Sequence, residues 1–144
     1  MEHPLMVWAQ SVKQLCTKSV KPLMDAFDLS VPEIGILLFL VENPAYDTCG
    51  ALAEQLLLAK SNVSTTIEQL VQKGFLIRET DQNDRRKIHL KPLPTALELV
   101  RQGRAAQDQT LHALLDDFTP EEIAQMRGVE QKLLERIRFI LKQD

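Results

Sequence analysis

The sequence has few of the features that mark secreted, membrane or disulfide-bonded proteins. Its 144 residues include two cysteines, Cys16 and Cys49, too few for a disulfide scaffold and too far apart for a Cys-x-x-Cys site. Hydrophobic runs stay well below the ~18 residues of a membrane span. Residues 1–4 lack the basic flank and apolar stretch of a secretory signal. We therefore expect a cytoplasmic protein that does not contact membranes.

Patterns typical of catalysis and metal binding are missing as well. The sequence has no glycine-rich phosphate loop and no nucleophile elbow. His3, His89 and His112 show no metal-ligand spacing, either with one another or with the cysteines. The paired carboxylates at 116–117 and 121–122 are typical of helix ends. We expect neither an enzyme nor a bound cofactor or metal.

The composition that remains is that of one ordinary globular domain, with 44% hydrophobic and 26% charged residues. The net charge of −3 argues by itself against nonspecific nucleic-acid binding. That charge is unevenly placed, however, because residues 60–91 carry +3 and the rest of the chain carries −6. This segment either faces a polyanion or is an ordinary solvated surface.

Hydrophobic periodicity predicts helices over most of the chain. The first covers residues 5–27, places Cys16 in the core, and should kink or break near Lys21 because Pro22 follows. A buried second helix starts at the capping box formed by Ser30 and Glu33 and ends at Asn43. Further helices are expected over about 49–57, 60–73, 94–116 and 120–142, with Thr48 and Thr119 as N-caps and Gly74 as a C-terminal stop.

A β-hairpin is predicted between the fourth and fifth helices. Segments 75–79 and 87–91 are β-prone, and the polar stretch 80–86 separates them. A short helix, a longer helix and a hairpin in direct succession are typical of a winged helix-turn-helix. The expected fold class is mainly α with a small β-hairpin wing. One domain spans residues 1–144, with the winged-helix region at 30–92 and terminal helices at 1–29 and 93–144.

The longer helix and the hairpin tip carry residue types that contact DNA. Short polar side chains let a helix enter the major groove closely, and an asparagine can bond adenine through two hydrogen bonds. Arginines suit a narrow minor groove. The alternatives are a merely polar helix face and a solvated loop tip. The candidate DNA-binding residues are Lys60, Ser61, Asn62, Ser64 and Thr65 on the helix and Asp84, Arg85, Arg86 and Lys87 on the wing.

At these positions the chain resembles the MarR family of bacterial transcriptional regulators. The matching segments are Leu52-Ala53-Glu54-x-Leu56-x-Leu58, Ser61-x-Val63-Ser64-x-x-Ile67-x-x-Leu70-x-x-Lys73-Gly74-Phe75-Leu76 and, most specifically, Asp81-x-x-Asp84-Arg85-Arg86. The chain departs from the family after the second strand, where Pro92-Leu93-Pro94-Thr95-Ala96 leaves either Leu93 or Thr95 as the cap of the fifth helix.

The resemblance implies a homodimer whose terminal helices interlock, with the helix at 60–73 as recognition helix. It also implies that Asp84 pairs with Arg86 while an arginine enters the minor groove. We expect the apolar stripe of the last helix to serve both the core and the dimer interface. The implied function is a repressor of a pseudo-palindromic operator in double-stranded DNA, relieved by a small molecule in the cleft between the dimerisation helices and the winged domain.

Two alternatives to a ligand-relieved repressor stay open at this point. The first is a winged-helix module that binds protein through its acidic surface. The second is a thiol-switched repressor, with Cys49 as the redox residue because it follows the helix cap Thr48.

Overall fold

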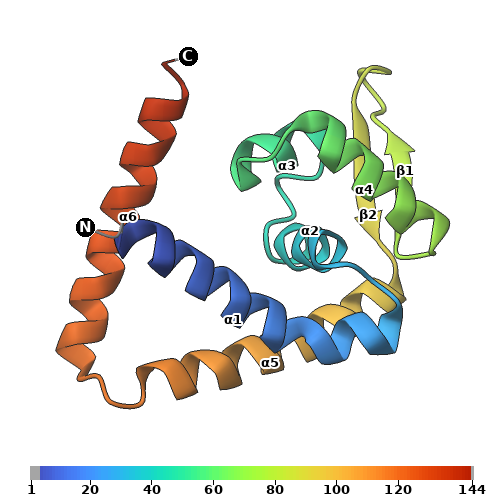
Figure 1. Cartoon of the computed structure of the whole chain (residues 1–144). Coiled ribbons are helices and arrows are strands. Elements are labelled where there is room, and N and C mark those ends of the chain that lie inside the picture. Colours follow the sequence, from blue (N-terminus) through green and yellow to red (C-terminus); the bar gives the residue numbers. More distant parts are fainter. Residues whose placement is uncertain (1–3, 144) are drawn as a thin grey trace. The chain divides into compact units, whose positions relative to one another are not determined.

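The computed structural model describes residues 4–143, which are mainly helical with one antiparallel hairpin (Figure 1). This is the predicted fold class. The chain divides into two compact units, residues 1–108 and residues 109–144, and helix α5 crosses the division. The elements are α1 (Pro4–Phe27), α2 (Val31–Glu42), α3 (Cys49–Leu56), α4 (Lys60–Gln72), β1 (Leu76–Thr80), β2 (Ile88–Pro92), α5 (Pro94–Leu115) and α6 (Pro120–Leu141).

Helix α1 continues through Pro22, so of the predicted kink or break near Lys21 the break is wrong. A proline inside a helix costs about 3 kcal/mol. Val20 and Leu23 flank it and are buried, and burying each such side chain contributes about 1.5–3 kcal/mol, which offsets that cost. Cys16 is exposed, which corrects its predicted place in the core, because the buried residues of α1 begin at Val20.

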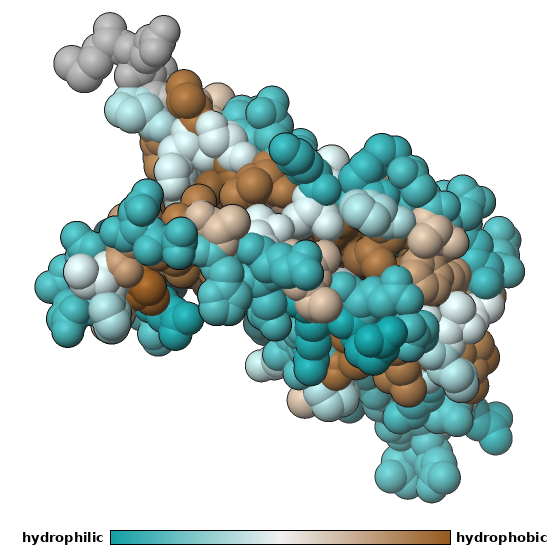
Figure 2. Space-filling model, turned by 90° about the horizontal axis from the view of Figure 1, so that it is seen from below, coloured by the Kyte–Doolittle hydropathy of each residue, from teal (hydrophilic) through white to brown (hydrophobic). Residues whose placement is uncertain are grey.

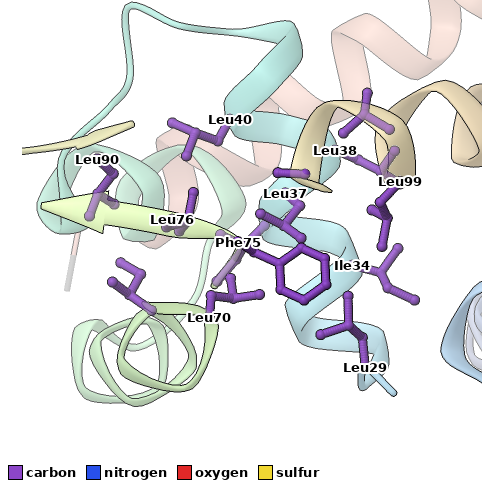
Figure 3. Packing of buried hydrophobic residues seen from close by; sticks show 14 of the residues in the cluster. Leu29, Ile34, Leu37, Leu38, Leu40, Leu70, Phe75, Leu76, Leu90 and Leu99 are labelled. Atoms are coloured by element: carbon purple, nitrogen blue, oxygen red, sulfur yellow. The ribbon is translucent and has the colours of Figure 1, made fainter. Parts of the chain in front are cut away.

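Helix α2 is the centre of the core, as its nearly continuous apolar sequence predicts. The Ser30 hydroxyl caps it by accepting a hydrogen bond from the Glu33 amide at 3.4 Å. The predicted capping box is one-sided, because the Glu33 carboxylate instead accepts two hydrogen bonds from Lys73 Nζ, at 3.0 and 3.1 Å. Figure 3 shows the side chains packed around α2, among them Leu29, Ile34, Leu37, Leu38, Leu40, Leu70, Phe75, Leu76, Leu90 and Leu99.

The hairpin β1–β2 is the wing, and its strands start one residue later than predicted. Pairing runs from Leu76 opposite Pro92 to Thr80 opposite Ile88. A two-stranded hairpin alone is marginal in water. This one is anchored because Leu76 and Leu90 are buried and because the Leu90 amide donates to the Asp47 carbonyl at 2.7 Å.

Leu93 is the residue that precedes helix α5. The Leu93 carbonyl accepts hydrogen bonds from the amides of Ala96 and Leu97, at 2.9 and 3.2 Å, so Leu93 precedes the helix and Thr95 lies inside it. Gly103 of this helix is buried, and a Cβ built there would lie 2.8 Å from Leu38 Cδ2. The glycine therefore allows α5 to approach α2 closely.

Helix α6 starts at the predicted capping box. Thr119 Oγ1 accepts from the Glu122 amide at 3.2 Å, and the Thr119 amide donates to the Glu122 carboxylate at 2.9 Å. None of the described residues of α6 is buried, so its predicted contribution to the core is wrong. Its exposed stripe comprises Met126, Val129, Leu133, Leu134, Ile137, Ile140 and Leu141.

Hydrophobic side chains also reach the surface elsewhere in the chain. Near the start of α1, Leu5, Met6, Val7 and Trp8 are all more than half exposed. Figure 2 shows hydrophobic residues lying between hydrophilic ones on the face that it presents. No helix within residues 4–143 has the length and hydrophobicity needed to cross a membrane.

Candidate nucleic-acid interface

The turn between α3 and α4 orients the candidate recognition helix. Thr48 caps α3 by accepting from the Ala51 amide at 3.2 Å, and Leu57 ends it in the left-handed conformation at φ 55°. Cys49 is half-buried, and its thiol lies 3.8 Å from the Lys60 carbonyl in the first turn of α4. Its predicted redox role stays a prediction.

Helix α4 presents the five predicted residues to solvent. Val63, Ile67 and Leu70 are buried, which turns the opposite side of the helix outward. Thr65 Oγ1 donates to the Ser61 carbonyl at 3.0 Å and keeps its lone pairs free to accept. Of the five, Lys60 is the one cationic side chain, so most of this face can act through hydroxyl and amide groups. The five exposed residues are Lys60, Ser61, Asn62, Ser64 and Thr65.

Two carboxylates shape the tip of the wing by binding backbone amides. Asp81 Oδ1 accepts from the amides of Asn83 and Asp84, at 2.8 and 2.9 Å. Asp84 Oδ1 accepts from the Arg86 amide at 3.0 Å and from Arg86 Nε at 3.4 Å. The Asp84–Arg86 pair is therefore the one implied by the resemblance. Asp84, predicted as a DNA contact, is used here to hold the loop.

The cationic side chains between residues 60 and 91 fall into two groups. Four of them are paired with acids: Lys73 with Glu33, Arg78 with Glu68 at 2.7 Å, Lys91 with Asp47 at 4.0 Å, and Arg86 with Asp84 at 3.4 Å. The hydrogen bond from Arg78 lowers the pKa of Glu68. Within residues 4–143, Lys60, Arg85 and Lys87 form no ion pair, and the side chain of Arg86 is 93% exposed. Cations that are unpaired or highly exposed therefore lie at the wing tip and at the start of α4.

A histidine that joins two carboxylates was missed by the sequence reasoning. His89 Nδ1 lies 2.9 Å from Asp47 Oδ1, and Nε2 lies 2.7 Å from Asp81 Oδ2. The hydrogen bond from His89, with those from the Asn83 and Asp84 amides, lowers the pKa of Asp81 to about 2. The same contacts, with Asp81 first and Asp47 second, raise the pKa of His89. The wing motif could have pointed to Asp81, whereas nothing local links His89 to a residue 42 positions earlier.

Comparisons with known proteins agree with this geometry. A model of the MarR family matches residues 27–87, from the end of α1 into the wing tip. Over this stretch, the chain is similar to the MarR family. A MarR-family structure from Peptoclostridium difficile aligns with a TM-score of 0.85 at 17% identity, covering 96% of this chain and 90% of that one. The DNA complex of Staphylococcus aureus MepR aligns at 0.79 and 18% identity, covering 94% and 98%.

Curated relatives match a stretch of 79 to 86 residues of this chain. A Thauera aromatica protein assigned to regulation of the hcr operon is 33% identical over 86 residues, which cover 58% of this chain and 51% of the relative. The Escherichia coli transcriptional repressor MprA is 28% identical over 79 residues, covering 55% and 45%. The chain therefore spans about half the length of the curated relatives it matches.

Proposed function

We propose that this protein is a sequence-specific DNA-binding transcriptional regulator of the MarR family, acting in the cytoplasm. Helix α4 enters the major groove and the wing tip enters the adjacent minor groove. The observation that carries the proposal is the wing tip, where Asp81 and Asp84 bind backbone amides and leave Arg85 and Lys87 unpaired within the described chain. This internal bracing fixes the backbone from which the cations project, and cations suit phosphates and the edges of a narrow groove.

The acting species in this proposal is a homodimer. Support comes from the exposed hydrophobic residues at the start of α1 and along α6, because large exposed apolar patches mark interaction surfaces. Two protomers related by a twofold axis would place their α4 helices in successive major grooves, about 34 Å apart. The operator is then a pseudo-palindrome.

Repression relieved by a small ligand is the mode of regulation that we propose. The name of MprA describes a repressor. Between α2 and α5 lies an open hollow of about 500 Å³, lined by Val41, Leu97, Val100, Arg101, Arg104, Ala105 and Asp108. A ligand there would need to favour a dimer spacing that misfits DNA by only ~1–3 kcal/mol.

The wing provides the sharpest test of DNA binding. Duplexes are first selected by the protein from a randomised pool, and affinities are then measured between about 50 and 200 mM salt. Arg85→Ala and Arg86→Ala should each weaken binding at least about tenfold and lower the salt slope by about one per wing. Arg127→Ala removes an exposed arginine from α6 and serves as the matched control.

Two results would contradict the proposal. If the wing variants keep the affinity and salt slope of the Arg127→Ala control, the wing does not contact DNA. If no duplex is enriched at low salt, the protein-binding alternative takes its place.

A further inference from the structure

The imidazole of His89 connects the wing tip to the body of the winged helix. On one side it meets Asp47, in the segment between α2 and α3, whose backbone carbonyl also accepts from the Leu90 amide at 2.7 Å. On the other side it meets Asp81, the carboxylate that holds the amides of the tip. The tip is therefore tied to the body through one side chain, in addition to the hairpin itself.

The charged groups around this ring are mainly acidic. Asp47 and Asp81 contact the two ring nitrogens, and Glu79 lies directly opposite His89 in the strand register. Lys91 is the nearby cation, 4.0 Å from the Asp47 carboxylate. The side chain of His89 is 28% exposed, so water can exchange protons with it while both carboxylates remain close.

The geometry is suited to a doubly protonated ring. An imidazolium donates from both nitrogens, whereas a neutral imidazole donates from one and turns a lone pair outward at the other. With carboxylate oxygens at 2.9 and 2.7 Å on the two sides, loss of a proton would set a lone pair against a carboxylate. One of the two contacts of the ring, to Asp47 or to Asp81, would then become repulsive.

We propose that His89 is the positioning residue of the wing and that protonation of its ring seats the wing tip on the body. As a consequence, which rests on the proposed DNA-binding function, affinity for DNA weakens as the pH rises and the ring loses its proton. The raised pKa of His89 agrees with this direction, because neighbouring carboxylates favour the charged ring. The limit is about tenfold in affinity per pH unit for each wing, set by one proton per ring.

The first experiment measures the protonation of His89 and the conformation of the wing tip in the absence of DNA. Imidazole and amide NMR signals of the full chain are followed from about pH 6 to about pH 9, a range around the ordinary histidine pKa. We expect the pKa of His89 to lie above the ordinary histidine value, and the Asn83 and Asp84 amides to shift with the His89 midpoint. In His89→Gln those amide shifts should vanish, and in Asp47→Asn the His89 midpoint should fall.

The second experiment measures affinity for a duplex selected from a randomised pool, at constant ionic strength over the same pH range. The wild type and His112→Gln should lose affinity as the pH rises, and His89→Gln should show a flat profile. If the chemical shifts of the tip amides do not change as His89 titrates, the positioning role is wrong. If His89→Gln keeps the wild-type pH slope, the link to DNA binding is wrong. If the amides respond and no duplex is enriched, the positioning role stands and the proposed function fails.

Discussion

Replacing Lys73 by methionine removes the cationic partner of a buried carboxylate. The Glu33 side chain is 4% exposed, and Lys73 Nζ donates to both of its oxygens, at 3.1 and 3.0 Å. The same ammonium donates to the Asp28 carbonyl at 2.8 Å, so it ties the α1–α2 connection to the end of α4. Methionine keeps an unbranched, flexible side chain that is one atom shorter, and it loses all three hydrogen bonds.

The expected loss in the free energy of unfolding lies between two known limits. Breaking a fully buried pair costs about 3–5 kcal/mol because a charge is left unpaired. An exposed pair contributes about 0–1 kcal/mol. Lys73 is 36% exposed, so water can enter where the ammonium was and hydrate Glu33 in part. We therefore expect Lys73→Met to lower the free energy of unfolding by about 2–3 kcal/mol.

Urea unfolding at a fixed protomer concentration measures this loss, since association would otherwise change the apparent stability. The matched control is Lys21→Met, which breaks the 2.7 Å pair with Asp25 between side chains 61% and 66% exposed. That variant should lose less than about 1 kcal/mol. Adding Glu33→Gln to Lys73→Met should recover about half of the loss, because a neutral amide costs less to bury than an unpaired carboxylate.

Equal stabilities of Lys73→Met and Lys21→Met would refute the reasoning. It would mean that Glu33 finds water or another donor as easily as an exposed acid does. Failure of Glu33→Gln to restore stability would place the loss in the Asp28 hydrogen bond instead.

Two further predictions concern the backbone and the response to acid. Gly74→Ala should destabilise the protein by about 1 kcal/mol because φ there is +81°, whereas Gly35→Ala, inside α2 with open space around it, should stabilise it by about 0.5–1 kcal/mol in the same urea assay. Asp81 has its pKa lowered from 3.8 to about 2, so its contribution to stability is complete above pH 4 and disappears as the pH falls through 2. The stability difference between wild type and Asp81→Asn should shrink over that interval, and a constant difference would show that the carboxylate does not titrate with folding.

Local signals predicted most of the fold. The caps at Ser30, Thr48 and Thr119 and the left-handed Gly74 lie within a few residues of the ends they define, and each is found in the structure. The prediction at Pro22 rests on the local cost of a proline alone, whereas the nearby buried residues that offset this cost depend on tertiary packing.

The candidate site is predictable only where its contacts are local in sequence. Side chains that point out from α4 follow from helical spacing, and the Asp84–Arg86 pair spans two residues. The contact between His89 and Asp47 joins residues 42 positions apart, and the Glu33–Lys73 pair joins residues 40 apart. Such pairings appear only once the chain is folded.

In the wing tip, the residues that hold the backbone conformation differ from the residues that present cationic side chains. Asp81 and Asp84 hold the backbone through amide groups, which every residue except proline supplies. The side chains of Arg85 and Lys87 take no part in that bracing and can be exchanged without rebuilding the turn. Under the proposed DNA-binding function, mutation can therefore change which DNA sequence the wing prefers at little cost in folding, so new specificities can evolve there one substitution at a time.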